Sequence, residues 1–294
     1  MDHDRLARAL RAPSAGPVTR RTPIAIAVGL ALAGGMPAAQ AGAPAPGAAL
    51  GNEFQVNTQI SSFQRQSAAA MDAAGDFVVT WTDYGGEDGD SSGIFAQRYH
   101  ADGTPAGTEF RVNTHTSGGQ ARPAVAMDAA GNFVVTWTDY SAEDGDSFGV
   151  FGQHYHADGT PDGAEFKVNT QTAGKQHRPA VAMDGAGDFV VTWMGDDGSA
   201  YGVFAQRYRA DGTPDGTEFL VNTNTVNSQR EAAVAMDAAG DFVVSWTDHS
   251  GEDGDAFGIF AQRFHADGTP NGAEFQVNTH FAGDQDVSTV AMDA

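Results

Sequence analysis

The pentapeptide Phe133-Val134-Val135-Thr136-Trp137 decides the fold, because it recurs with little change along the chain. Its aromatic and β-branched residues favour a strand. The tryptophans at its last position are 56, 56 and 53 residues apart: Trp81, Trp137, Trp193 and Trp246. Self-similarity at a fixed period is the signature of a repeat protein. The sequence therefore predicts a tandem array of β units.

The residues around this pentapeptide predict four strands in each unit. In the second unit, residues 123–128 form a short apolar strand, and Gly131 allows a tight turn into residues 133–137. An acidic, glycine-rich loop leads to a third strand at 150–156, and the turn pair Asp-Gly follows. Residues 165–170 alternate between polar and apolar side chains, as expected of a half-exposed outer strand.

Four antiparallel strands in about 56 residues are typical of a β-propeller-like, all-β array. One such sheet alone would bury too little apolar surface, which favours stacked units. A preceding fourth strand at 53–58 and a trailing first strand at 288–293 predict an incomplete array, with a closed ring of four units as the alternative. The predicted units are 67–114, 123–170, 179–223 and 232–279, with a partial unit at 288–294.

The repeated phrases FVVTW, GIFAQR or GVFAQR, and DGTPxGxEFxVNT resemble tandem repeats of large secreted bacterial proteins. In those proteins the repeats are often joined to haemolysin-type calcium-binding or adhesin-like regions. The resemblance covers residues 51–294 and implies propeller-like repeats; a secreted or cell-surface binding or adhesion module is the function that we expect.

The first 41 residues predict a secretory signal peptide. The pair Arg20-Arg21 precedes a short apolar run at 24–33, and Ala39-Gln40-Ala41 supplies an A-x-A cleavage site. We expect a linker at 42–50, the β-repeat domain at 51–294, and an exported protein in the periplasm, at the cell surface or outside the cell. The general secretory and twin-arginine routes both stay open.

Composition excludes several classes of function. The formal net charge is −22, so the acidic surface should repel nucleic acid and anionic membranes, and the mature chain has no segment for membrane insertion. There is no cysteine, which excludes disulfides, thiolate metal sites and cysteine nucleophiles.

Three acidic loops are candidate calcium sites, because calcium prefers several oxygen ligands in a flexible loop. The third unit keeps only a shortened loop, Asp196-Asp197-Gly198. The alternative is a solvated turn whose carboxylates keep the protein soluble. The candidate ligands are Asp83, Glu87, Asp88, Asp90, Asp139, Glu143, Asp144, Asp146, Asp248, Glu252, Asp253 and Asp255.

The acidic loops and the variable linkers between units should share one face of the array, which makes that face the candidate binding site. Phe148, Tyr201 and Phe257 occupy equivalent loop positions there and could hold a sugar ring, or else pack onto the next unit. We therefore expect a carbohydrate or protein ligand.

Nearly every acidic residue and tryptophan recurs from unit to unit, so no unique catalytic constellation stands out. This pattern predicts a binding module and not an enzyme. The alternatives are a structural surface spacer and a propeller-type polysaccharide-degrading enzyme. The enzyme would need acids that differ between units, such as Asp284 or Asp286.

Overall fold

The computed structural model describes residues 52–60, 62–254, 257–280 and 282–293. The predicted signal peptide and linker therefore lie outside the described residues. The chain divides after Glu53, and the fold is that of the unit Phe54–Ala294. Within the described ranges, no helix is long and apolar enough to cross a membrane.

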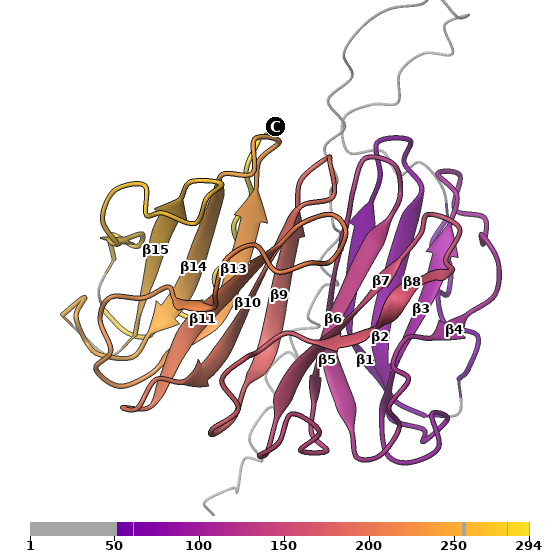
Figure 1. Ribbon diagram of the computed structural model, residues 1–294, viewed down its shortest axis with the longest axis horizontal. Helices are drawn as coiled ribbons and strands as arrows, with labels where there is room; N and C mark the ends of the chain where they lie inside the picture. The colour runs from indigo at the N-terminus through magenta and orange to yellow at the C-terminus, as the bar shows by residue number, and fades with distance from the viewer. Residues whose placement is uncertain (1–51, 61, 255–256, 281, 294) are drawn as a thin grey trace, which may run out of the picture. The chain divides into compact units, whose positions relative to one another are not determined.

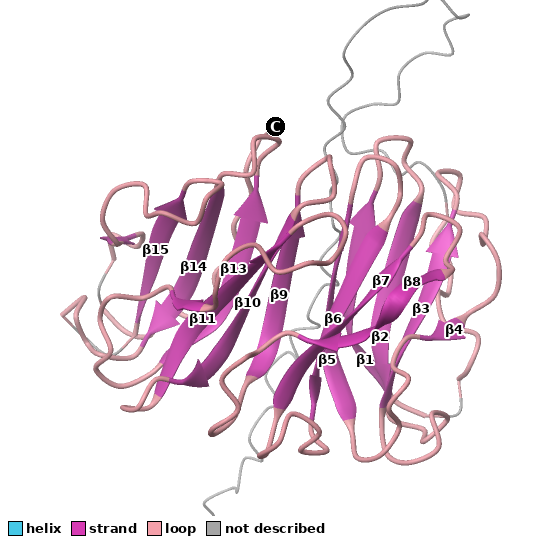
Figure 2. Ribbon diagram, viewed as in Figure 1, coloured by secondary structure: helices cyan, strands magenta, loops and turns pink. Residues whose placement is uncertain are grey.

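Four antiparallel sheets of four strands each make up this unit (Figures 1 and 2), so the all-β prediction is confirmed. Within each sheet the strands follow chain order. Unit one contains β1 (Gln64–Met71), β2 (Phe77–Asp83), β3 (Gly93–Tyr99) and β4 (Phe110–Arg111). Unit two contains β5 (Gln120–Met127), β6 (Phe133–Asp139), β7 (Gly149–Tyr155) and β8 (Pro161–Lys167). Unit three contains β9 (His177–Met183), β10 (Phe189–Asp196), β11 (Tyr201–Tyr208) and β12 (Phe219–Leu220). Unit four contains β13 (Gln229–Met236), β14 (Phe242–Asp248), β15 (Gly258–Phe264) and β16 (Phe275–Gln276).

Successive units stack through their first two strands. The strand β5 contacts β1 and β2, β9 contacts β5 and β6, and β13 contacts β9 and β10. The first strands β1, β5, β9 and β13 are therefore neighbours, and we call them the inner strands. Figure 1 shows the four sheets side by side in chain order, from indigo to yellow. This is the arrangement of an incomplete propeller-like array.

The hydrophobic core lies between units, not within them. Trp137, Trp193 and Trp246 are fully buried. The cluster around Trp137 also contains Val78 and Ile94 of unit one, and equivalent clusters join units two and three and units three and four. Because one sheet cannot cover its own aromatic side chains, each unit depends on its neighbour for burial.

The fourth strands end earlier than predicted, because an asparagine side chain replaces the strand ladder. The predicted strand at 165–170 is observed as β8, Pro161–Lys167. Beyond it, the Asn169 side-chain oxygen accepts a hydrogen bond from the Val150 N–H at 2.8 Å. Equivalent asparagines in units one and three accept from Ile94 and Val203. The asparagine of the repeated VNT phrase thus closes each sheet at its outer edge.

Each inner strand contains a bulge that the sequence did not predict. One residue of every bulge has a positive φ although it is not glycine, a conformation rare for such residues: Gln66, Arg122, Arg178 and Glu231. In two of them the bulged N–H donates to a threonine of the preceding unit, from Arg122 to Thr82 Oγ1 at 3.1 Å and from Arg178 to Thr138 Oγ1 at 2.9 Å. The bulge therefore fixes units two and three against the units before them, whereas the threonine is replaced by Met194 in front of unit four.

The segments before unit one and after unit four make the same contacts that an adjacent unit would make. Neither segment forms a strand. The Tyr99 hydroxyl donates to the Val56 carbonyl, as Tyr155 does to Val112 inside the array. Beyond unit four, Val287 repeats the positive φ of the bulge, and its N–H donates to Thr247 Oγ1 at 3.1 Å. The predicted strands at 53–58 and 288–293 are thus replaced by extended segments in equivalent positions.

The bulge contact predicts a specific loss of stability. In Thr138→Val the acceptor of the Arg178 N–H is lost, and an unsatisfied N–H of this kind costs about 1–3 kcal/mol. We expect a lower midpoint of urea unfolding. The matched control is Thr192→Val, because the buried Thr192 hydroxyl has no hydrogen-bond partner among the described residues and its removal should cost little. Equal losses in the two variants would contradict the role assigned to the bulge.

Candidate functional site

The loops between second and third strands lie on the same face as the linkers between units, as predicted. Asp90 in the first such loop accepts a hydrogen bond from the Gly118 N–H of the next linker at 2.7 Å. Asp146 accepts from Gly174 in the same way at 2.8 Å. Loops and linkers of adjacent units therefore form one continuous surface, which we call the loop face.

The first aspartate of each long acidic loop is a buried structural acceptor. Asp139 is 1 % exposed and accepts hydrogen bonds from the Gln120 side chain at 2.9 Å and from the Ser141 N–H at 2.7 Å. Asp83 and Asp248 make the same contacts with Gln64 and Gln229. These carboxylates hold the start of the loop to the inner strand.

A second acid of the predicted calcium sites, Asp144, also has hydrogen-bond partners of its own. Asp144 accepts from the Asp146 N–H and from the Asn169 side chain. Both carboxylate oxygens of Asp144 are thus occupied by donors of the protein, and calcium binding stays a prediction. Of the remaining candidates, Asp88 and Asp253 are buried, Glu87, Asp90, Glu143, Asp146 and Glu252 are exposed, and Asp255 lies outside the described residues.

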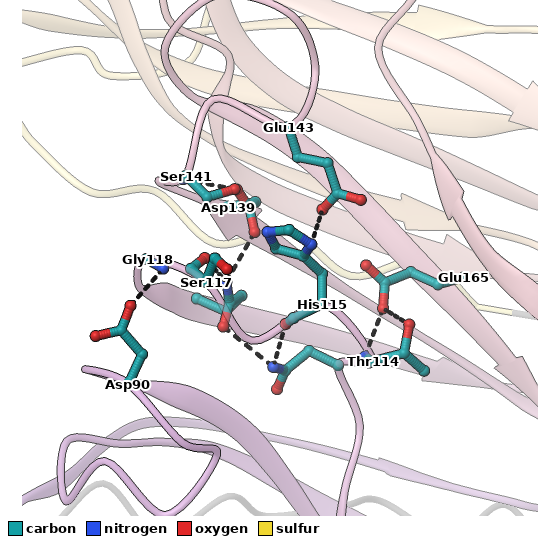
Figure 3. Close-up of polar contacts among 11 residues, drawn as sticks. Asp90, Thr114, His115, Ser117, Gly118, Asp139, Ser141, Glu143 and Glu165 are labelled. Atoms are coloured by element: carbon teal, nitrogen blue, oxygen red, sulfur yellow. Dashed lines mark hydrogen bonds and ion pairs between the residues drawn. The ribbon is translucent and has the colours of Figure 1, made fainter.

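One cluster of possible ligand atoms does occur in the described part of the chain. Atoms of His115, Asp139 and Glu143 lie within 4.8 Å of one another. Figure 3 shows His115 Nδ1 turned toward Glu143 Oε2, at 3.3 Å. Burial raises the pKa of the Glu143 carboxyl, the positive charge available on His115 opposes this, and the carboxylate of Glu165 adds to it.

The His115 contact has a counterpart without histidine. In unit four the equivalent linker residue, Asn224, donates to Glu252 at 2.6 Å. A polar side chain of the linker therefore holds the loop glutamate in both units. We interpret His115 and Glu143 as a tether between linker and loop.

The three predicted ligand-binding rings are half-buried and each lies against another ring of the loop face. Phe148 packs edge-on against Tyr140, its ring centre lies 6.2 Å from that of His177, and the Tyr201 ring centre lies 5.3 Å from that of His177. Phe257 stacks on His249 with centroids 3.7 Å apart. Phe148 and Tyr201 are therefore brought together through His177, whereas Phe257 lies in a separate pair.

A group of charged residues at the start of the inner strands was missed by the sequence analysis. Arg178 on β9 forms an ion pair with Glu231 on β13. The guanidinium of Arg230 lies 5.6 Å from the centre of the Tyr201 ring. We call the following residues the inner-strand cluster: Arg122, His177, Arg178, Arg230, Glu231 and Asp286.

The charges in this cluster act on one another. Burial, followed by the charges of Arg178 and Arg122, lowers the pKa of His177 to about 4. Burial and the neighbouring Arg122 also lower the pKa of Arg178, whereas Asp286 opposes that change. His177 is therefore neutral at pH 7, and the positive charges around it are only partly neutralised by the two acids.

A sequence signal for this cluster does exist, because its members break the repeat. The bulge position holds Gln66, Arg122, Arg178, Glu231 and Val287 in successive units. The repeated phrases show what the units share, so the positions that differ between units are not apparent from them. The unequal residues, and not the repeated acids, make one part of the loop face different from the rest.

No protein-family model matches the sequence, and neither does any curated protein. Several solved structures are similar in fold. An α-L-arabinanase of Penicillium chrysogenum, solved with arabinobiose, has a TM-score of 0.56 at 12 % identity, over 79 % of this chain and 72 % of that one. A protein of unknown function from Dyadobacter fermentans has a TM-score of 0.55 at 15 % identity, over 75 % and 71 %. A Hadza microbial sialidase has a TM-score of 0.50 at 12 % identity, over 79 % of this chain but 48 % of its own.

These matches confirm the propeller-like fold and correct one prediction. We expected that the chain is not an enzyme, but the arabinanase and the sialidase are enzymes on the same fold. Acidic residues recur from unit to unit because they hold loops and linkers in place. Their recurrence therefore does not mean that catalytic groups are absent. The resemblance to secreted adhesin-associated repeats and the predicted export stay predictions.

The electrostatics of the inner-strand cluster predict the titration of His177. We expect its imidazole to titrate at about pH 4 in an NMR experiment, because burial and nearby cations disfavour the charged form. Arg122→Met should move this midpoint upward by removing one cation, whereas Arg263→Met, on the exposed side of β15, should leave it unchanged. A midpoint near the ordinary value of 6.5 in the unaltered protein would show that His177 is not enclosed by this cluster.

Proposed function

We propose that the protein is a propeller-type enzyme that hydrolyses polysaccharide, with its substrate bound on the loop face over the inner-strand cluster. The observation that carries the proposal is the ion pair of a non-repeated acid, Glu231, with Arg178, and the electrostatic effect of a second non-repeated acid, Asp286, on the same arginine. The likeness to the fold of an arabinanase supports it. A carbohydrate ligand is the expectation that this proposal shares with the binding-module interpretation.

Glu231 and Asp286 lie at the loop-face end of two neighbouring inner positions, which are the strand β13 and the segment that follows unit four. Glu231 is on β13 at the strained bulge, where it is paired with Arg178. Asp286 follows unit four, is exposed, and accepts a hydrogen bond from the Thr247 hydroxyl at 3.0 Å. Glu231 forms an ion pair with Arg178, and the Asp286 carboxylate favours the charged form of the same arginine. Strained backbone held in place by its surroundings is frequent at active sites.

Glycoside hydrolysis needs two carboxyl groups in different protonation states. One donates a proton to the glycosidic oxygen, and the other, as a carboxylate, activates water or attacks the anomeric carbon. The bond from that carbon to the leaving oxygen breaks, and water supplies the new hydroxyl and the returning proton. The ion pair with Arg178 suits Glu231 to the carboxylate role, and we assign the proton-donor role to Asp286.

The rings around His177 suit a sugar as well. Phe148 and Tyr201 both lie near this imidazole, and half-buried rings can pack against the C–H groups of a saccharide. Arg230 lies over Tyr201 and adds hydrogen-bond donors at the same place. The specificity for the substrate would then come from residues that differ between units.

The proposal is tested by the release of reducing ends from a panel of polysaccharides. Glu231→Gln and Asp286→Asn should each lower kcat by at least about a hundredfold, since loss of one acid–base group typically costs 10²–10⁴. Asp284→Asn is the matched control, because Asp284 is an exposed acid two residues from Asp286 and should matter little. Unchanged melting temperatures would show that the variants fold. Activity that survives both substitutions, or no hydrolysis of any polysaccharide, would refute the proposal.

A further inference from the structure

In this acidic protein, arginine is concentrated at one place, the start of the inner strands. The chain has 16 Lys and Arg against 38 Asp and Glu. Nevertheless, every unit contributes one arginine within the first three residues of its inner strand: Arg65, Arg122, Arg178 and Arg230. These arginines do not share one register position, so the repeat itself does not account for them. The common feature is positive charge at the loop-face end of the inner strands.

Three of these guanidinium groups are coupled to one another. Arg122 and Arg230 both disfavour the positive charge of Arg178, and both also act on His177. One carboxylate, that of Glu231, pairs directly with Arg178. Like charges kept close together in a partly buried place are unfavourable unless a counter-charge is present. The resident acids supply only part of that counter-charge.

Several nitrogen atoms of this cluster have no partner. Arg178 Nε, Arg230 Nε and His177 Nε2 are enclosed by the protein, and none has a hydrogen-bond partner among the described residues. Buried polar atoms are nearly always hydrogen-bonded, so a group of unpaired ones calls for an ion, a water or a ligand. Guanidinium N–H groups are donors only, and their preferred acceptors are carboxylate and other oxyanions.

The rings at the same place indicate that such an anion belongs to a larger ligand. Tyr201 is near both Arg230 and His177, and Phe148 is near His177 as well. A free inorganic anion would use the guanidinium groups alone, whereas a charged sugar would use the donors and the apolar ring faces together.

We propose that Arg122, Arg178 and Arg230 bind the anionic group of an acidic saccharide, either the carboxylate of a uronic acid or a sulfate ester. The inference rests on the proposed function and names its substrate class. The net charge of −22 does not prevent such binding, because salt screens charges beyond about 8 Å at physiological ionic strength. Binding of an anion at the cluster is then determined by the nearby charges of Arg122, Arg178 and Arg230.

The test is equilibrium binding of oligosaccharides by calorimetry, with no need for turnover. We use a polygalacturonate fragment, a sulfated galactan fragment and a neutral galactan fragment of equal length. Arg122→Met and Arg230→Met should each weaken binding of the acidic ligand by about tenfold or more, because each removes one charge-assisted contact. The affinity should also fall as salt rises. The preferred acidic fragment identifies which anion the cluster selects.

Arg263→Met is the matched control. Arg263 lies on β15 with its guanidinium 5.9 Å from the Phe275 ring, much as Arg230 lies over Tyr201, but it is exposed and outside the cluster. Its loss should leave the affinity unchanged. Equal weakening by Arg263→Met, or equal affinity for the neutral fragment, would overturn the inference.

The binding result is separable from the proposed hydrolysis. Binding of an acidic fragment that Glu231→Gln retains, without hydrolysis by the unaltered protein, would support the anion site and refute the enzyme. Hydrolysis of the neutral polysaccharide, with no binding of either acidic fragment, would support the enzyme and overturn the anion site.

Discussion

Burial of aromatic side chains between units is the constraint on which the rest of the structure depends. Trp137, Trp193 and Trp246 are covered only because a neighbouring sheet packs against them, so no unit is complete by itself. That packing brings the inner strands together, and the bulges fix their register through a backbone N–H and a threonine of the preceding unit. Side chains at the start of each inner strand are thereby held next to those of the adjacent units.

The packing of the units also distinguishes the acids that have a structural role from the acids that are candidates for a function. The repeated aspartates of the loops accept hydrogen bonds from their own units, as Asp139 does from Gln120 and Ser141. The repeated glutamates join units, as Glu165 does when it accepts from the Thr114 N–H at 2.6 Å (Figure 3). Chemistry that needs unlike groups can therefore arise only at positions where the repeat is broken, and the inner-strand cluster is such a place.

The sequence was sufficient for the all-β fold, the four-stranded units and the loop face, because period-2 patterning and the recurrent tryptophans report burial directly. It was insufficient for the bulges, since Arg122 and Arg178 at positive φ contradict local preference and are imposed by stacking. It also did not show that acids of the predicted calcium loops such as Asp144 accept internal hydrogen bonds, because such a carboxylate has the same composition signal as a calcium ligand. The inner-strand cluster joins residues from separate units, and only the register of the packed array shows that Arg178 meets Glu231.

The central claim is that a saccharide binds on the loop face over the inner-strand cluster. The most direct measurement is an NMR titration of the histidine side chains with an acidic oligosaccharide. The account predicts that the resonances of His177 shift on binding, whereas those of His156 and His265, which follow the third strands β7 and β15 at the opposite end of their sheets, stay in place. Shifts confined to His156 and His265, or no shift of His177 at saturating ligand, would contradict it.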